Sequence, residues 1–220
     1  MKVKVASTNP AEAVRLTAQG PSGRNMPCEE DTVSTELLLP QVSMPGLSFR
    51  EWQAGDAAAL ARFMTRPEYN RWLAVKLQSV AEIDVVLKRH LARQKSRNRR
   101  HFRLCAVDAG TGELIADGFI WLLGGGAAEV GWGVDPSVWD TGAGTMMGEV
   151  LCAMAIERLD ATEVWCKVMA PNLASARIAG KLGFSMQRTV MPGSTGLNRA
   201  HDVEIYRLLA QEYFERGYAI

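Results

Sequence analysis

The stretch EVGWGVDPSVWDTGAGT, residues 129–145, decides which fold this chain adopts. Its first half alternates like a strand that ends near Asp135-Pro136, and after a loop Gly142-x-Gly144 opens a long helical segment. Unpaired backbone N–H groups and a partial positive charge gather at the start of a helix. Glycines there let the backbone approach a ligand closely, so this strand, loop and helix suit a phosphate or pyrophosphate.

Taken alone, this segment is a weak signal, because a plain tight turn into a helix has the same pattern. No Gly-Lys-Ser/Thr follows the glycines, which excludes a Walker loop. The GxGxxG pattern of dinucleotide sites is incomplete, and no acid lies at the required distance. The choice between a turn and a phosphate site therefore depends on the rest of the chain.

The segments on either side predict an α/β fold. Their order predicts a mixed sheet, largely antiparallel, with a parallel pair in the second half. Asp56 is a plausible N-cap of the first helix, and Ser79 with Glu82 forms a capping-box signature for the second. Residues 108–112 suit a hairpin turn. Alternating runs predict strands at 47–52, 101–107, 114–123, 128–135, 163–169, 184–190 and 202–209, and apolar stripes predict helices at 56–64, 79–94, 142–159 and 172–182.

Residues 1–46 differ in composition from the rest of the chain. They hold five of the nine prolines, and only Leu37-Leu38-Leu39 offers a strand-like run. The chain has 220 residues, which allows one domain with a sizeable core and an appended arm. We therefore expect a partly irregular arm over 1–46 with one short strand, followed by one domain over 47–220.

The composition is that of an average soluble protein, with 47% hydrophobic and 22% charged residues. The net charge of +1 argues against binding of polyanions through bulk charge. We see no secretory signal and no apolar stretch long enough to span a membrane, which predicts a cytoplasmic protein without membrane contact. The cysteines show no CxxC pair and no metal-ligand spacing with the histidines, so buried reduced thiols and no metal are expected for Cys28, Cys105, Cys152 and Cys166.

Two motifs carry a resemblance to a known family. EVGWGVDPSVWDTGAGTMMGEVL resembles the pyrophosphate-binding segment of the GNAT acyltransferase superfamily, and in particular the branch that contains ribosomal-protein N-terminal acetyltransferases, roughly E-I-G-Y-W-L-D-P-x-x-W-G-x-G-Y-A-T. Downstream, PNLASARIAGKLGF (171–184) resembles that branch's N-x-x-S-x-x-x-x-x-K-L-G-F, and LSFREWQAGDAAAL (47–60) resembles its first strand and helix. The resemblance covers residues 47–209, and the first motif matches at Glu129, Gly131, Asp135, Pro136, Trp139, Gly142 and Thr145.

The resemblance implies a GNAT fold, with a mixed central sheet of about seven strands flanked by about four helices and splayed in the middle to hold CoA. It implies transfer of an acetyl group from acetyl-CoA to a primary amine, of a protein N-terminus or a small molecule, by direct attack in a ternary complex and without a metal. It places the pyrophosphate on the backbone of residues 141–145, the pantetheine along residues 133–135 and near Asn172, and a cofactor phosphate near Arg177. The implied cofactor-binding residues are Gly133, Val134, Asp135, Trp139, Thr141, Gly142, Ala143, Gly144, Thr145, Asn172 and Arg177.

Glu129 is the best candidate for a general base, acting through water or on an amine that is already partly neutral. An α-amine of pKa ~8 is about one tenth neutral at pH 7 and a lysine of pKa ~10.4 well under one thousandth, so a base matters far more for lysine. Ser175 is the best candidate for a hydrogen bond to the departing thiolate. The plainer readings are a strand residue that only contacts solvent or substrate for Glu129, and a helix-packing residue for Ser175. Glu204 is a second acid that could face the acceptor.

Two departures from the family pattern leave alternatives open. Gly133 stands where an aromatic residue is common, and Ala179 where many members have a tyrosine that protonates the thiolate. The first could leave room for a longer acyl chain. Together they allow a non-catalytic acyl-CoA-binding or regulatory module in place of an enzyme.

The acceptor is less well specified by the sequence. We expect Tyr69, Trp72 and the loop 192–196 to line its site. His201 suits a plain surface residue better. The basic run 88–103 suits a solvated helix end, or else an acidic partner such as RNA, although it lacks the interleaved aromatic residues that stack on bases. Nucleic acid is therefore not an expected partner, and a homodimer is possible.

Overall fold

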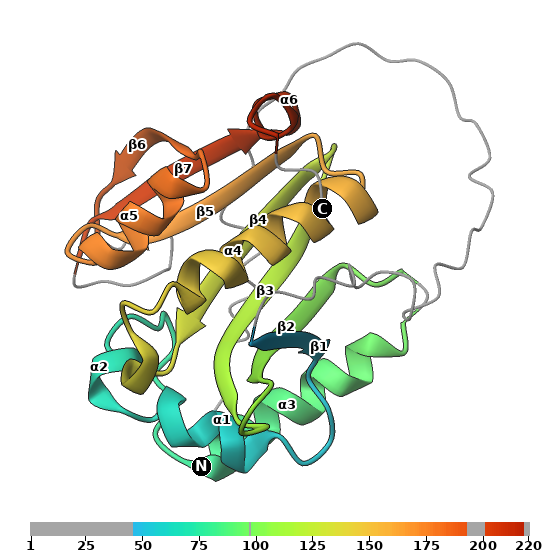
Figure 1. Ribbon diagram of the computed structural model, residues 1–220, viewed down its shortest axis with the longest axis vertical. Coiled ribbons are helices and arrows are strands. Elements are labelled where there is room, and N and C mark those ends of the chain that lie inside the picture. Colours follow the sequence, from blue (N-terminus) through green and yellow to red (C-terminus); the bar gives the residue numbers. More distant parts are fainter. Residues whose placement is uncertain (1–45, 97, 193–200, 218–220) are drawn as a thin grey trace, which may run out of the picture.

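The computed structural model describes residues 46–96, 98–192 and 201–217, so nearly all of the predicted arm, including the run 37–39, lies outside the described residues. Within them a seven-stranded sheet has the order β1-β2-β3-β4-β5-β7-β6, which confirms the predicted number of strands (Figure 1). The strands are β1 Leu47–Glu51, β2 His101–Asp108, β3 Leu114–Gly124, β4 Ala127–Val134, β5 Glu163–Met169, β6 Ser185–Val190 and β7 Val203–Leu209.

The direction of the strands agrees with the prediction as well. The first four strands form an antiparallel meander, in which β2 pairs with β1 and β3, and β3 with β4. β4 and β5 are parallel, and β7 pairs antiparallel with both β5 and β6. The sheet is therefore mixed, with its parallel pair in the second half of the chain.

The parallel pair separates partway along its length. β4 and β5 are in register from Ala127 opposite Glu163 to Val130 opposite Cys166. β4 nevertheless continues to Val134 and β5 to Met169, without pairing to each other. This split is the predicted splay in the middle of the sheet. The strand edges that face it have no partner strand, so their backbone groups are free to pair with a ligand.

Six α-helices accompany the sheet in the described residues, two more than the four predicted. The predicted four correspond to α1, α3, α4 and α5, while α2 and α6 are too short for their periodicity to show in a sequence. A π-helical turn, Met154–Arg158, completes α4 where one continuous helix was expected. The helices are α1 Ala57–Met64, α2 Pro67–Asn70, α3 Val80–Gln94, α4 Ala143–Ala153, α5 Leu173–Lys181 and α6 Ala210–Glu215.

Each face of the sheet has its own core. Against one face pack α4 and α5, and the predicted apolar stripe of α4 is fully buried there, with Met147 and Leu151 among the largest buried side chains. A second core, formed by α1, α3, the second half of β2 and the start of β3, contains Trp52 and Phe63. Figure 1 shows α4 running across β3 and β4, with α1, α2 and α3 gathered at the other end of the molecule from β6.

The side chains of β4 point alternately to these two faces, which determines which of them lie on the side of Glu129. Successive side chains of a strand point to opposite faces. Val130 belongs to the core beneath α4. Glu129 and Gly131 therefore face the opposite side of the sheet, and the split beside them opens a passage between the two faces.

The two predicted helix caps have different outcomes. The Ser79 hydroxyl accepts a hydrogen bond from the Glu82 amide at 3.2 Å, as predicted, although the Glu82 carboxylate accepts from the Gln78 amide instead of completing a capping box. Asp56 precedes α1 but caps nothing with its side chain. Its carboxylate is held by Arg50 at 2.8 Å, an ion pair that takes priority over the cap.

Candidate active site

A cavity of about 760 Å³ occupies the split between β4 and β5. We call it the central cavity. Its volume is in the range of small-molecule sites. On one face of the sheet the cavity is lined by the loop before α4 and by α5. On the opposite face, where Glu129 lies, it is lined by α2 and by strands β2 to β5.

Most of the predicted site residues line the central cavity, although they come from segments up to 48 positions apart in the sequence. They are Glu129, Gly133, Val134, Trp139, Gly142, Gly144, Thr145, Asn172, Ser175 and Arg177. Asp135, Thr141 and Ala143 do not belong to the lining.

The start of α4 carries the free backbone donors of the cavity. Gly142 is the N-cap, and its φ of 94° lies in the left-handed region that only glycine adopts without strain. Its carbonyl accepts from the amides of Thr145 at 2.9 Å and Met146 at 3.0 Å. In the described part of the chain the amides of Gly142 and Gly144 make no hydrogen bond, so they are available to an anion. The amide of Thr145, predicted to bind the pyrophosphate, is used within the helix.

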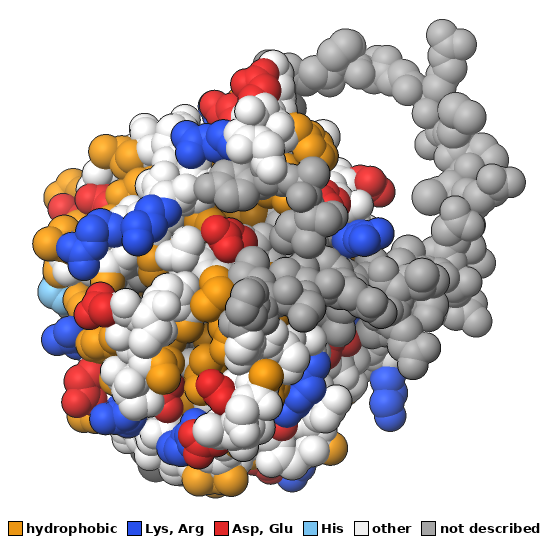
Figure 2. All heavy atoms as spheres, in the orientation of Figure 1, with side chains coloured by type: hydrophobic (Ala, Val, Ile, Leu, Met, Phe, Trp, Pro, Cys, Tyr) orange, Lys and Arg blue, Asp and Glu red, His pale blue; other side chains and the backbone are white. Residues whose placement is uncertain are grey.

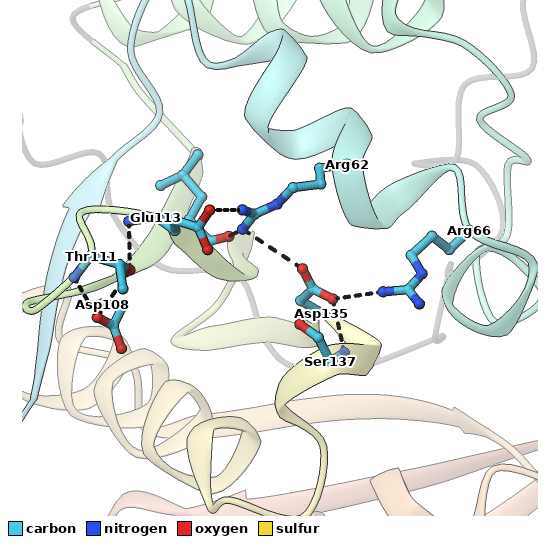
Figure 3. Close-up of polar contacts among 8 residues, drawn as sticks. Arg62, Arg66, Asp108, Thr111, Glu113, Asp135 and Ser137 are labelled. Carbon is cyan, nitrogen blue, oxygen red and sulfur yellow. Dashed lines mark hydrogen bonds and ion pairs between the residues drawn. The ribbon is translucent and has the colours of Figure 1, made fainter.

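Asp135 has a structural role that the sequence prediction missed (Figure 3). Its amide donates to the Ile115 carbonyl at 2.8 Å, and its buried carboxylate accepts from the Ser137 amide at 2.9 Å. Arg66 lies 3.3 Å and Arg62 3.8 Å from the same carboxylate. Asp135 therefore ties the end of β4 to α1, and its backbone donor is not free to pair with a pantetheine arm.

Trp139 covers the end of β4. Its indole Nε1 donates to the Val134 carbonyl at 3.0 Å, while 42% of the residue stays exposed. The indole thus shields the strand end at the mouth of the split, and its outer face is free to contact a ligand.

The N-terminus of α5 closes the same side of the cavity. The Asn172 side chain caps this helix, because its Oδ1 accepts from the Ser175 amide at 3.2 Å. Ser175 is half-buried and lines the cavity. Ala179 is fully buried among core residues, so this helix provides no tyrosine hydroxyl.

Glu129 is 8% exposed and lies on the other face of the sheet. Its Oε2 is 2.6 Å from the Nζ of Lys167. Lys167 comes directly after Cys166, the last β5 residue that pairs with β4, so the ion pair stands where the split begins. Glu129 is thus a buried, paired carboxylate that lines the cavity.

Lys167 was missed as a site residue, although the sequence holds a signal for it. Cys166 and Val168 are buried in the core, and alternation then turns Lys167 toward the Glu129 face.

The rest of this side comes from α2, β2 and β3. Tyr69 and Trp72 line the cavity, as predicted, together with Arg103, Asp117 and Phe119. Arg103 Nη1 lies 2.7 Å from Asp117 Oδ2. Burial raises the pKa of Asp117 to about 6, against the opposing effect of Arg103. Asp117 was missed, although it is the single charge in the apolar run 114–123.

Gly133 does not leave the open space that its missing side chain suggested. A methyl group built on Gly133 would collide with the hydroxyl and ring of Tyr69. Tyr69 is 6% exposed and packs edge-on against Phe63, with ring centroids 5.2 Å apart. The tyrosine from α2 therefore fills the space beside Gly133 on β4.

The other acceptor-side predictions fall elsewhere. Glu204 accepts a hydrogen bond from the Tyr206 hydroxyl at 2.6 Å and does not line the cavity. His201 is exposed and lies outside the lining. Of the loop 192–196, residues 193–196 lie outside the described residues.

Part of the basic run 88–103 is engaged within the protein. Arg99 is paired with Glu51 and nearly buried, Arg103 turns into the cavity, and Arg100 donates to the Leu122 carbonyl at 3.0 Å. On the face shown in Figure 2, cationic and anionic side chains are interspersed with hydrophobic ones. These three arginines of the run are therefore held within the protein.

Cysteine and metal chemistry find no support in the described residues. Cys105, Cys152 and Cys166 are buried and unpaired, and burial raises the pKa of Cys105 to about 12 and that of Cys166 well above its usual value. Protonated thiols are poor nucleophiles. The described residues contain no group of three His, Cys, Asp or Glu side chains that could hold a metal ion. They also contain no helix long and apolar enough to span a membrane.

Comparison with known proteins gives a family match and similar folds. Residues 47–185 match the family described as acetyltransferase (GNAT) domain. No curated protein sequence matches the chain.

Solved structures show the same fold. Spermidine N-acetyltransferase from Vibrio cholerae, in complex with CoA and spermine, matches with a TM-score of 0.67 at 15% identity, covering 78% of this chain and 99% of that one. Ribosomal-protein-S5-alanine acetyltransferase from Vibrio fischeri gives 0.66 at 14% identity, covering 76% and 95%. A GNAT-family acetyltransferase from Bacillus anthracis gives 0.62 at 14% identity, covering 75% and 95%.

Proposed function

This chain belongs to the acetyltransferase (GNAT) domain family and is an N-acetyltransferase. We propose that it transfers the acetyl group of acetyl-CoA directly to a primary amine held beside Glu129. The observation that carries the proposal is the central cavity, which passes through the split sheet and joins two differently built halves. We call them the cofactor half, made by the loop before α4 and by α5, and the acceptor half, made by Tyr69, Arg103, Asp117, Glu129 and Lys167.

The cofactor half suits CoA. The free amides of Gly142 and Gly144 meet the pyrophosphate at a helix N-terminus, where the helix dipole adds a favourable field. The unpaired edge of β4 beyond Val130 runs along the split and suits the amide groups of a pantetheine arm, which pair like an added strand. Trp139 and Arg177 border the same space.

The acceptor half supplies the base. Glu129 accepts a proton from the amine, directly or through one water, as the nitrogen attacks the thioester carbonyl and the carbon–sulfur bond breaks. Lys167 holds the carboxylate in place through an ion pair of 2.6 Å. On the cofactor side Ser175 donates a hydrogen bond to the departing thiolate, a role that Ala179 leaves open.

Tyr69 limits the acyl group. Its ring takes the space above Gly133 that a longer acyl chain would need. We therefore favour acetyl over longer acyl groups, in contrast to the wider pocket that Gly133 alone suggested.

Turnover tests this function directly. The chain is incubated with acetyl-CoA and a panel of amines and N-terminal peptides, including spermidine and an alanine-initiated peptide, and free thiol and acetylated product are both measured. We expect equal amounts of thiol and N-acetyl product with at least one acceptor. Tight acetyl-CoA binding with no acetylated product from any acceptor would instead favour a non-catalytic acyl-CoA-binding module.

A further inference from the structure

Arg103 is held rigidly at the wall of the acceptor half. Its guanidinium carbon lies 4.7 Å from the ring centroid of Trp52 and 5.5 Å from that of Phe119. Its Nη1 is fixed by Asp117 at 2.7 Å. Stacking and one ion pair therefore orient a planar cation before any ligand arrives.

Most donors of Arg103 remain available. A guanidinium carries five N–H donors. Within the described residues, the bond to Asp117 is the one hydrogen bond that the Arg103 side chain makes. Arg99, four residues earlier, is a contrast, because its side chain donates to the Glu51 carboxylate and to the His101 carbonyl. Arg103 thus behaves like a binding residue and Arg99 like a structural one.

The charges of the acceptor half favour an anion. Its two carboxylates, Asp117 and Glu129, are each already paired with a cation. Arg71 adds a third cation, which stacks over Trp72 at 4.6 Å. Among the described residues, each carboxylate of this half already has a cationic partner, although Asp117 Oδ1 is buried without a hydrogen bond.

We propose that Arg103 is an anion-binding residue of the acceptor site and that the acceptor is an amine that also carries a carboxylate. This inference rests on the proposed function and names its substrate class. A carboxylate fits the fork of a guanidinium through two N–H donors. A polyamine, by contrast, brings further cations to a half that already has three.

The spacing agrees with a small acceptor. In the sheet register Arg103 is opposite Phe119, which is opposite Gly131 at the start of the split. Two strand spacings separate the Arg103 and Gly131 backbones, or about 10 Å. The long arginine side chain shortens that span, so an amino acid or a dipeptide can reach from Arg103 to Glu129.

Binding of products tests the inference without turnover. The probes are N-acetylalanine and N-acetylphenylalanine, each compared with its uncharged carboxamide, added to the full chain in the presence of CoA and measured by calorimetry. We expect the acids to bind at least 10-fold more tightly than the amides. Equal binding of acid and amide, or no binding of the acids, would overturn the proposal.

Variants assign the effect to Arg103. Arg103→Gln removes the cation, and Arg103→Gln combined with Asp117→Asn avoids leaving a buried carboxylate unpaired. Both should lose the preference for the acids by 10-fold or more while still binding CoA. Arg100→Gln is the control, because Arg100 is a cation of the same run that lies outside the cavity. This variant should keep the preference for the acids. A preference that survives in both Arg103 variants would contradict the assignment.

Turnover separates the two proposals. Alanine, phenylalanine and Ala-Ala are compared with their carboxamides and with spermidine. The amides carry the more easily neutralised amine, so faster acetylation of the acids points to recognition of the carboxylate. Acetylation of spermidine or of the amides in preference to the acids would remove the inference and leave the proposed function standing. No acetylation of any amine would remove the proposed function, and the binding measurement would then decide on Arg103 alone.

Discussion

The cofactor half and the acceptor half of the central cavity meet at the same split, yet they are built in different ways. The cofactor half is local and made largely of backbone, with Gly142 and Gly144 at a helix start. The acceptor half is assembled from α2, β2, β3, β4 and β5, and its chemistry lies in paired side chains. One half can therefore stay the same whatever the substrate, while the other can change its specificity by single side chains.

The largest effect is expected in the acceptor half. Glu129→Gln should lower kcat by 100- to 1000-fold, the range for loss of a general base, while CoA binding stays within about twofold. Steady-state kinetics with binding measured in parallel checks this. Lys167→Met is the matched control, because it removes the partner and keeps the carboxylate, and it should retain at least about a tenth of kcat. Equal losses in the two variants would show that the ion pair only supports the structure.

The buried Asp117 makes the acceptor half sensitive to pH. Its pKa in the folded chain, about 6, is above the ordinary value of 3.8, so folding favours the protonated form. Stability from this group is full below about pH 4 and is lost as pH rises through 6. Asp117→Asn should therefore raise the free energy of unfolding by up to about 3 kcal/mol at pH 8, with the gain disappearing near pH 4. Urea unfolding at pH 8 and pH 4.5 measures it. A gain that is equal at both values would show that the ionised carboxylate is not the cause.

The cofactor half should respond to backbone strain. Gly142→Ala forces a side chain into the left-handed region at a cost of about 1–2 kcal/mol and should weaken CoA binding about 5- to 30-fold. Gly125→Ala is the control, because Gly125 also has a positive φ, of 61°, and open space around it, but lies outside the cavity lining. It should share the loss of stability and keep CoA affinity. If both variants bind CoA like the native chain, the loop before α4 is not the pyrophosphate site.

The smallest effect concerns the boundary between the halves. Tyr69→Leu should open space above Gly133 and shift the ratio of butyryl-CoA to acetyl-CoA turnover about 10-fold toward butyryl, the effect of a small change in pocket length. Tyr69→Phe keeps the ring and should shift the ratio far less. An unchanged ratio in Tyr69→Leu would place the acyl group away from Gly133.

The same contrast explains what the sequence could predict. The cofactor half follows from consecutive residues, so Gly142, Asn172 and Ser175 could be found from motifs and their spacing. The side-chain role of Asp135 was missed because its motif position says nothing of its partners, Arg62 and Arg66, which are about 70 residues earlier in the chain.

Within the acceptor half, Glu129 and Tyr69 were predicted from the sequence, but Arg103, Asp117 and Lys167 were missed. Arg103 looked like one more cation in a basic run, and only the register of β2 with β3 brings it to Asp117. Tyr69 of α2 fills the space beside Gly133 of β4. No local sequence pattern predicts this contact between distant segments. The seven strands and their order along the chain were predictable from the sequence, while the short helices α2 and α6 were not.

The central claim is that the split sheet brings acetyl-CoA and an amine together for direct transfer. A single-turnover experiment with labelled acetyl-CoA tests it, first without an amine and then with the best acceptor of the panel, following the label on protein and on amine by mass spectrometry. We predict no label on a cysteine before the amine is added, and label on the amine equal to the CoA released afterwards. A labelled cysteine that passes its acetyl group to the amine, or CoA released without acetylated amine, would contradict the account.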